Sequence, residues 1–600
     1  MDCFVSVVTT VWHPEDIVMT NPPPTKKLKQ TTIFEVLKKQ SSLEGSSHSV
    51  QTVHHFEGEI NMADVKNEPG SSGVNRNVVA QAAEKRAMPS MDENCVSNIK
   101  PATEEYLSQG SVLTNSDVND SPLLFSEVGQ TPVPHPAVYS DRWDADYVKL
   151  PCSPENLYPV EDKKGNKSLH GRWELVQQAL LTNMSSTLDL EEAILTYNVR
   201  YSKRWNFHGL HSFFTEILER KEVDAFFANI LPKMINLALQ LPRLCTQPIP
   251  MLKKHMDHSL TMSQQQVACL LANAFFCTFP RRNTAKRQSE YSSYPDINFS
   301  RLFQNSDNAR QKLEKLNCII NYFKRVTTDM PVGTITFKRQ HITDFPDWHR
   351  SSARLCRLHV TCAGTIEDDG QGMLQVDFAN KYLGGGVFGY GSVQEEIRFL
   401  ICPELIVSRL FTEELDQNEC LIITGCERYS NYTGYADSFK WSGNHIDKIP
   451  RDSWGRICTQ IVAIDALVFK SYRDQFHENL IRRELNKAYC GFLVPGVAAK
   501  HLSAIATGNW GCGAFGGDLQ LKADIYSLIL QYYDSMCQKI SQSRKPQRNL
   551  FQYIYSMHAD PGEDTDSTEA LGSTDADESS QEAQFHLSHR DSPDYAAATP

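Results

Sequence analysis

The stretch of residues 374–396 constrains the fold more than any other part of this 600-residue chain. An apolar run at 374–378 has the length of a buried strand, and a helical pattern begins near Val393. Three consecutive glycines at 384–386 lie between the two. Consecutive glycines let backbone N–H groups approach a ligand closely, and a following helix N-terminus favours negative charge. The pattern therefore predicts a strand–loop–helix unit that binds an anion, with a diphosphate as the natural ligand.

A dinucleotide-binding Rossmann unit is one alternative for this loop. Residues 384–389 read Gly-Gly-Gly-Val-Phe-Gly and satisfy the spacing Gly-x-Gly-x-x-Gly. That fingerprint places its glycines directly at the strand end and starts the helix on the third glycine. Here residues 379–383 intervene, and Gly391 and Ser392 still precede the helix. The spacing therefore disfavours a nicotinamide site. A flexible connector is the other alternative, but it predicts no particular neighbours, whereas carboxylates and amides flank this loop.

Two adjacent carboxylates, Glu395 and Glu396, follow the loop at the start of the predicted helix. Ser392 and Glu395 have the spacing of a capping box, so we expect Glu395 to accept the Ser392 N–H. Glu396 has no such structural role, and it points about 100° away from its neighbour on a helix. Carboxylates that diverge in this way cannot face each other across a scissile bond as the usual glycosidase pair does. In a glycosidase, one glutamate would do acid and base work while the other orients the substrate. Taken alone, Glu396 would be interpreted as part of a solvated helix face.

The rest of the chain divides into four predicted parts. Composition predicts a disordered region at 1–150, where too little apolar surface is present to offset chain entropy. Apolar residues at i, i+3 and i+4 predict an all-helical accessory domain at 151–332, with a capping box at Ser186 and Asp189. Short apolar runs alternating with helical patterns predict an α/β domain with a buried sheet at 333–540, and residues 541–600 form an acidic disordered tail. The expected strands are 355–361, 374–378, 420–424 and 461–467, and a helix is expected at 519–540.

Composition argues against several classes of protein. The net charge of −12 comes mostly from the tail, since residues 559–600 hold eleven Asp or Glu and one Arg. The remaining chain has no strong basic excess, which argues against direct reading of nucleic acid. No apolar run approaches the roughly 20 residues of a membrane span, and the first residues lack the basic start of a secretory signal. The sixteen cysteines contain no CxxC pair, so we expect free thiols in a reducing compartment and no metal site.

Two short motifs lie in the predicted disordered region. Residues 22–29 read Pro-Pro-Pro-Thr-Lys-Lys-Leu-Lys, the composition of a nuclear-import signal. Residues 30–37, from Gln30 and Ile33 to Val36 and Leu37, resemble a weak sliding-clamp binding box. That box requires two aromatic residues where Val36 and Leu37 stand, so an ordinary amphipathic turn is the favoured interpretation.

The stretch 377–396 resembles the signature of poly(ADP-ribose) glycohydrolases, in which a run of glycines is followed by Gln-Glu-Glu. Three further blocks resemble family segments in the same order: Gly-Thr-Ile-Glu at 364–367, Tyr-Thr-Gly-Tyr at 432–435 and Gly-Asn-Trp-Gly-Cys-Gly-Ala-Phe-Gly-Gly at 508–517. The likeness covers roughly residues 151–517, is highly specific and is strongest for the animal enzymes.

This resemblance implies both a fold and an activity. The fold is a three-layer α/β/α macrodomain with a mixed sheet, preceded by the helical accessory domain. The activity is hydrolysis of the ribose–ribose O-glycosidic bonds of poly(ADP-ribose), mainly from the chain end, with release of ADP-ribose. The implied partners are poly(ADP-ribose) and ADP-ribosylated proteins, without nucleic acid, membrane, cofactor or metal. The implied setting is a monomer of the DNA damage response in the nucleus and cytoplasm.

The resemblance also implies roles for individual residues. Glu396 matches the catalytic acid/base, Glu395 the residue that holds ribose hydroxyls, and Asp377 the third carboxylate of the catalytic group. The remaining implied substrate contacts are Ile366 and Glu367 at the edge of adenine, Tyr435 stacked on adenine, Gly384, Gly385 and Gly386 on one side of the diphosphate, Asn509 and Phe515 on the other, and Asn380 and Gln394 in the polar pocket. Without the resemblance, Tyr435 and Phe515 would be interpreted as ordinary surface or core aromatics.

The chain departs from the family pattern near its C-terminal end. Family members of this type continue after the Gly-Gly-Asp of residues 516–518 with a helix, an apolar strand and another helix. No Val/Ile-rich strand follows Asp518 here. If that strand belongs in the central sheet, we expect this chain to leave a sheet position empty or to expose an edge. An alternative function follows from this departure, namely a weakened or inactive module that binds ADP-ribose or its polymer.

Overall fold

The computed structural model describes the chain in separate stretches, and all of them belong to the compact unit Met1–Gln547 rather than to the unit Arg548–Pro600. The described residues are 6–9, 123–124, 132–161, 166–282, 287–304, 310–349, 359–361, 364–495, 503–522 and 525. The predicted acidic tail, most of the predicted helix at 519–540 and both short motifs at 22–37 lie outside them.

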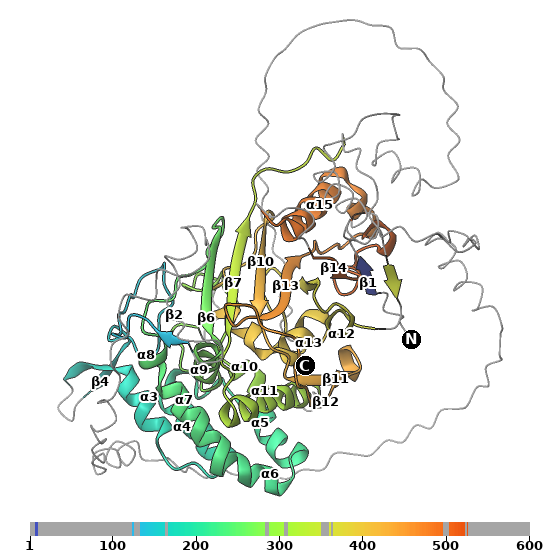
Figure 1. Ribbon diagram of the computed structural model, residues 1–600. Coiled ribbons are helices and arrows are strands. Elements are labelled where there is room, and N and C mark those ends of the chain that lie inside the picture. The colour runs from blue at the N-terminus through green and yellow to red at the C-terminus, as the bar shows by residue number, and fades with distance from the viewer. Residues whose placement is uncertain are drawn as a thin grey trace, which may run out of the picture. The chain divides into compact units, whose positions relative to one another are not determined.

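An eight-stranded mixed sheet forms the centre of the fold (Figure 1). Its strands β13, β9 and β14 run parallel to one another, and all other neighbours are antiparallel. In spatial order the strands are β6 (His258–Ser263), β7 (Thr334–His341), β10 (Glu419–Gly425), β13 (Ile457–Asp465), β9 (Leu374–Ala379), β14 (Ile505–Thr507), β1 (Ser6–Thr9) and β8 (His359–Thr361). The apolar runs expected at 374–378, 420–424 and 461–467 correspond to β9, β10 and β13.

Both faces of the sheet are covered, which gives three layers. On β13, Ile461 and Ala463 join the core shared with the helical region, whereas Val462 and Ile464 face α15 (Glu478–Phe492). A Cβ on Gly491 of α15 would lie 2.7 Å from Ile464, so glycine lets this helix approach the sheet closely. This alternation buries β13 on both faces, as parallel strands require. The predicted α/β/α architecture is confirmed.

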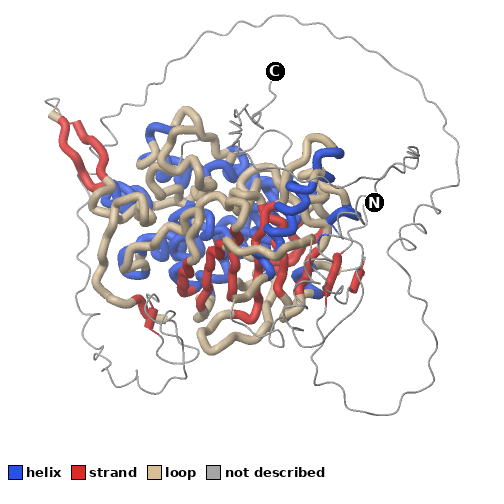
Figure 2. Tube along the Cα trace, turned by 90° about the horizontal axis from the view of Figure 1, so that it is seen from above, coloured by secondary structure: helices blue, strands red, loops and turns tan. Residues whose placement is uncertain are grey.

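Most of the layer opposite α15 is helical. Figure 2 shows the strands of the sheet side by side with helices packed against them. At the start of α4 (Thr187–Thr196), the Ser186 side chain accepts the Asp189 N–H, and Asp189 accepts the Ser186 N–H at 2.9 Å, which confirms the predicted capping box. The helices are α3 (Arg172–Leu180), α4 (Thr187–Thr196), α5 (His208–Ser212), α6 (Arg220–Ala225), α7 (Leu231–Leu239), α8 (Leu241–Leu244), α9 (Gln264–Phe275), α10 (Ser300–Phe303), α11 (Arg310–Thr328), α13 (Gln394–Ile401) and α14 (Ser408–Phe411), with two π-helical segments at Phe213–Ile217 and Phe226–Ile230.

The helical region is not purely helical and not separate from the sheet. Its strand β6 pairs with β7, and the alternating buried residues Leu260 and Met262 are the period-two signal that the sequence analysis missed. Two small hairpins also occur, β2 (Leu123–Leu124) with β3 (Val133–Pro134) and β4 (Leu157–Glu161) with β5 (Lys167–Gly171). Val148 and Leu150 are buried, so ordered packing begins before the predicted boundary at residue 150.

The strand β1 fills the sheet position beside β14. Val7 pairs with Thr507 of β14 on one side and with Val360 of β8 on the other, both antiparallel. The expectation of an empty position or an exposed edge is therefore wrong at β14. A segment from the region predicted to be disordered supplies the strand that the sequence after Asp518 does not.

Candidate active site

The candidate site lies where β9 ends and α13 begins. Asp377, on β9, is 1% exposed, and neither of its carboxyl oxygens has a hydrogen-bond partner within the described part of the chain. Burial raises the pKa of Asp377 to about 8, the Glu396 carboxylate acts in the same direction, and Arg398 opposes it. A buried acid without a partner is costly when ionised, so Asp377 is mostly neutral at pH 7.

Glu395 lies beside the loop rather than along the helix. It is 3% exposed, and its carboxylate accepts the Gly384 N–H at 2.6 Å and the Asn380 N–H at 2.8 Å. Burial raises the pKa of Glu395, and the neighbouring carboxyl groups of Asp377 and Glu396 raise it further, whereas the two N–H groups lower it. The predicted capping contact between Glu395 and the Ser392 N–H is therefore wrong, because Glu395 is used to hold the loop.

Glu396 is the residue that caps the helix. Its carboxylate accepts the Val393 N–H at 3.0 Å and the Gly386 N–H at 2.8 Å. Because α13 begins at Gln394, Glu396 stands at the third helical position, from which a side chain reaches back to the N-cap. Glu396 thus caps the helix, a structural role that the sequence pattern had indicated for Glu395 instead. Glu396 is 6% exposed.

The glycine loop, defined here as residues 383–391, wraps around these two carboxylates. Gly385 has φ +41°, and a Cβ there would lie 2.6 Å from Glu396 Oε1 and 2.8 Å from Glu395 Oε2. A Cβ on Gly391 would lie 2.7 Å from Glu396 Cδ. The loop needs glycine because it passes between two carboxylates. The N–H groups of Gly384 and Gly386 are bonded to those carboxylates, and diphosphate binding by the loop stays a prediction.

Of two predicted pocket residues, Gln394 fastens α13 to the end of β9, and Asn380 orders the start of the loop. Gln394 Oε1 accepts the Phe378 N–H at 2.8 Å, and its Nε2 donates to the Val376 carbonyl at 3.2 Å. Asn380 Oδ1 accepts the Tyr382 N–H at 3.0 Å. The amide side chains therefore order the strand–loop–helix unit itself.

The predicted adenine-side residues come from two further segments. The Tyr435 hydroxyl accepts the Gln394 N–H at 3.2 Å, which places Tyr435 at the start of α13 after β11 (Ser430–Thr433), a strand paired with β12 (Lys440–Asn444). Ile366 is buried on α12 (Ile366–Asp369), and Glu367 accepts the Tyr432 hydroxyl at 2.5 Å. Strand β11 is thus joined to α12 through Tyr432, and the segment after it is joined to α13 through Tyr435.

The predicted diphosphate wall follows β14. Because β14 and β9 are parallel neighbours, with Ala506 opposite Gln375, the loops after both strands leave the same edge of the sheet. Asn509 and Phe515 are half-buried there. The buried Trp510 anchors this loop through Nε1, which donates to the Ile464 carbonyl at 2.9 Å.

Comparison with known proteins supports the same family on both halves of the fold. A family model described as poly(ADP-ribose) glycohydrolase (PARG), Macro domain fold, matches residues 345–535, and one described as the helical domain of the same family matches residues 218–339. The chain is 34% identical over 423 residues to poly(ADP-ribose) glycohydrolase 1 of Arabidopsis thaliana, a match that covers 56% of this chain and 74% of the relative. The chain belongs to the poly(ADP-ribose) glycohydrolase family. The chain is also 32% identical over 436 residues to a probable poly(ADP-ribose) glycohydrolase 2 of Arabidopsis thaliana, a match that covers 61% of this chain and 78% of the relative. It is 37% identical over 279 residues to poly(ADP-ribose) glycohydrolase 1 of Caenorhabditis elegans, a match that covers 44% of this chain and 33% of the relative.

Two buried cations of this glycohydrolase-family chain escaped the sequence analysis. Lys315, on α11, donates from Nζ to four carbonyls of the glycine loop, those of Gly386 and Val387 at 3.2 Å, Gly389 at 2.9 Å, and Gly391. Burial lowers the pKa of Lys315 to about 7, and the Glu396 carboxylate opposes this shift. Arg409, on α14, contacts the opposite end of the loop. A lysine within the apolar stripe of a helix was the available signal for Lys315.

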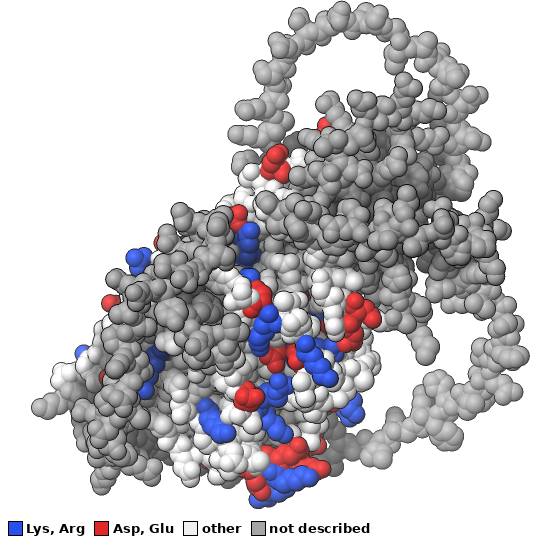
Figure 3. All heavy atoms as spheres, viewed as in Figure 1, with Lys and Arg blue, Asp and Glu red and all other residues white. Residues whose placement is uncertain are grey.

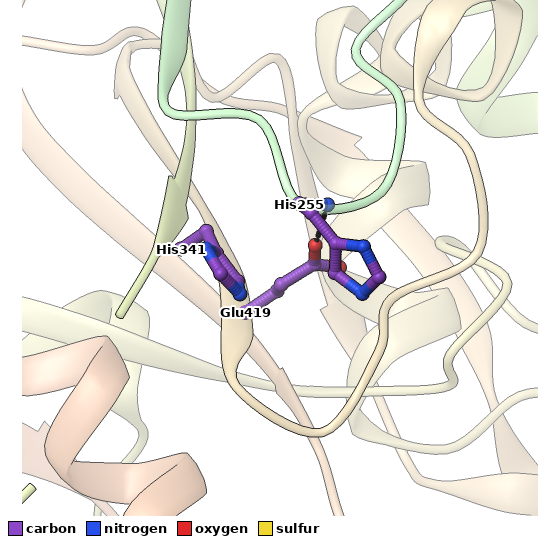
Figure 4. A group of neighbouring side chains, drawn as sticks. All are labelled: His255, His341 and Glu419. Atoms are coloured by element: carbon purple, nitrogen blue, oxygen red, sulfur yellow. Dashed lines mark hydrogen bonds between the residues drawn. The ribbon is translucent and has the colours of Figure 1, made fainter. Parts of the chain in front are cut away.

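One group of side chains in the described part of the chain has the spacing of metal ligands. His255, His341 and Glu419 each offer a ligand atom, and these atoms lie within 4.8 Å of one another (Figure 4). Glu419 already forms a fully buried ion pair with Arg339 and accepts the His255 backbone N–H. This neutralised carboxylate is a poor cation ligand, and none of the family residues discussed above belongs to the group.

Other surface and thiol features carry less information. On the face drawn in Figure 3, basic and acidic side chains of the described residues are interspersed. The cysteines that the structure describes are free, and most of them are buried. No helix within the described stretches is long and apolar enough to cross a membrane.

Proposed function

We propose that this chain hydrolyses the ribose–ribose O-glycosidic bonds of poly(ADP-ribose), acting mainly at the chain end and releasing ADP-ribose. The observation that carries the proposal is the cluster of Asp377, Glu395 and Glu396, three buried carboxyl groups gathered around one glycine loop. Family membership supplies the substrate class. The names of the relatives support the glycohydrolase activity, and the preference for chain ends rests on the resemblance.

The proposed chemistry assigns acid and base work to a single residue. Glu396 protonates the departing ribose oxygen and then, as a carboxylate, takes a proton from the water that attacks the oxocarbenium-like carbon. Glu395 orients ribose hydroxyls, and its separate hydrogen bonds to Asn380 and Gly384 support this division. Asp377, whose pKa burial raises to about 8, completes the polar pocket behind the two glutamates.

The remaining contacts follow from the segments that meet at this sheet edge. Tyr435 stacks on adenine with Ile366 and Glu367 at its edge, while Asn509 and Phe515 hold the far side of the diphosphate and distal ribose. The hydrogen bond that the Gln394 N–H of α13 donates to the Tyr435 hydroxyl supports this arrangement, as does the parallel pairing of β14 with β9. Gly384, Gly385 and Gly386 line the near side of the diphosphate.

The experiment is incubation of the full chain with end-labelled poly(ADP-ribose), with products resolved by length. The expected result is free ADP-ribose from the earliest time points. A loss of about 10²–10⁴-fold in turnover is expected in Glu396→Gln, with ADP-ribose affinity nearly unchanged. The exposed Glu216→Gln is the matched control and should behave as wild type. Early short oligomers would contradict the chain-end preference, and polymer bound without any release would show a binding module instead.

We also propose that the chain works on ADP-ribosylated proteins in the nucleus and cytoplasm as part of the DNA damage response. The basic run at 22–29 supports nuclear entry. Fluorescence microscopy of the tagged full chain, with the lysines at 26, 27 and 29 changed to alanine in a second sample, tests this point. An unchanged nuclear signal in that variant would remove the support that the basic run gives.

A further inference from the structure

Arg409 contacts the two peptide units that hold the site glutamates. It is 4% exposed, and its Nη1 donates to the Leu383 carbonyl and, at 3.4 Å, to the Gly385 carbonyl. Its Nε donates to the Asp296 carbonyl at 2.7 Å, which fixes the guanidinium on the other side. The acceptors of Arg409 are thus backbone oxygens of the loop and of one adjoining segment.

The N–H group of each of these peptide units donates a hydrogen bond to a glutamate carboxylate. The Leu383 carbonyl and the Gly384 N–H belong to one peptide, and that N–H donates to Glu395 at 2.6 Å. The Gly385 carbonyl and the Gly386 N–H belong to another, and that N–H donates to Glu396 at 2.8 Å. In a planar trans peptide the C=O and N–H bonds point in opposite directions. Fixing the carbonyl therefore fixes the direction of the N–H.

We infer that Arg409 is a positioning residue that sets both site glutamates through these two peptide planes. A guanidinium suits the task because its rigid plane fixes Nη1, which reaches both loop carbonyls, relative to Nε, which is held by the Asp296 carbonyl. The glycine residues of the loop have little steric resistance to peptide rotation, so an external clamp is needed to keep the planes in place. Lys315 holds the carbonyls of the second half of the loop in the same manner. The role rests on the proposed function for its catalytic consequence, but the clamp itself can be measured separately.

The first test measures kcat and the loop together in Arg409→Ala. We expect kcat to fall by about 10²-fold, because a displacement of about 1 Å in a catalytic group has that effect. Amide hydrogen exchange in a peptide that covers residues 383–391 should become faster. Addition of methylguanidinium should restore at least part of kcat, and methylammonium should not. Unchanged exchange in this loop, or unchanged kcat in the folded variant, would overturn the inference.

Matched variants separate positioning from general loss of stability. Arg172→Ala removes another guanidinium that donates to a backbone carbonyl, that of Tyr197, in the helical region. It should leave kcat and loop exchange as in wild type, and an equal loss of kcat would overturn the inference. Arg409→Lys keeps the charge without the fork and should remain about tenfold below wild type, so full activity in it would also count against the two-plane argument. If wild type released no ADP-ribose, the proposed function would fail while the exchange measurement still decided the role of Arg409.

Discussion

The buried carboxyl group of Asp377 gives this protein a specific dependence of stability on pH. The pKa of Asp377 is raised to about 8 in the folded chain by burial, with a smaller contribution from Glu396. An aspartate in the unfolded chain has a pKa of about 3.9. A group whose folded pKa is raised stabilises the fold below its unfolded pKa and loses that contribution as pH rises through its folded pKa. Between these two values the folded state holds about one more proton than the unfolded state.

The magnitude follows from this difference of one proton. Each pH unit changes the contribution by about 1.4 kcal/mol, so wild type should lose about 3 kcal/mol from this group between pH 5 and pH 7. In Asp377→Asn the carboxyl group is absent and this loss disappears. The free energy of unfolding of the variant, compared with that of wild type, should therefore improve steadily as pH rises from 5 to 7.

Urea unfolding followed by fluorescence at pH 5, 6, 7 and 8 measures this comparison. Asp189→Asn is the control, because hydrogen bonds from backbone N–H groups lower the pKa of Asp189 and its contribution changes only at more acidic pH. The control should differ from wild type by a constant amount over this range. The same constant difference in Asp377→Asn would mean that Asp377 is ionised in the folded chain and stabilised by Arg398, which would refute the reasoning.

Two more predictions concern the loop and the sheet. Gly385→Ala should lower both ADP-ribose affinity and kcat by at least tenfold, because its Cβ would meet both glutamates. Calorimetry measures the affinity, and polymer hydrolysis measures kcat. Gly372→Ala is the control for backbone strain alone, because Gly372 has φ +74° and a Cβ there would have nothing within 4 Å. If both variants lost activity equally, the close approach to the carboxylates would not be the cause. Val7→Pro should lower the free energy of unfolding by about 1–3 kcal/mol, because proline removes one of the ladder hydrogen bonds that β1 makes and leaves its acceptor unpaired. An unchanged thermal midpoint would mean that β1 contributes nothing to the sheet.

Local sequence signals predicted β9 and α13, which position the site, and the N-cap of α4 in the helical region. Each of three signals depends on only a few consecutive residues, and each predicted feature is present: the apolar run of β9, the start of α13 near Val393 and the capping box at Ser186. The capping contact of α13 was predicted for Glu395, but Glu396 makes it. Ser392 has the right chemistry for an N-cap, but the helix begins one residue later because Glu395 is bonded to the loop instead.

Contacts between distant segments could not be predicted in this way. Arg409 and Lys315 reach the glycine loop only after α14 and α11 have packed against it, and neither residue has a local motif. Likewise, β1 comes from a region whose composition indicates disorder, and its strand exists only because β14 and β8 offer it two partners. Local composition reports what a segment can bury by itself, which is why it failed for a strand that other segments complete.

The position of β1 has a consequence for biosynthesis. Its partners lie at residues 359–361 and 505–507, so the ribosome must add about 500 residues before the second partner exists. At roughly 5–20 residues per second this takes about half a minute or longer. Throughout that time the nascent chain carries a strand that lacks at least one of its two neighbours, a state that favours pairing with other chains. Slow elongation or scarce chaperones should therefore reduce the yield of this protein more than its equilibrium stability would indicate.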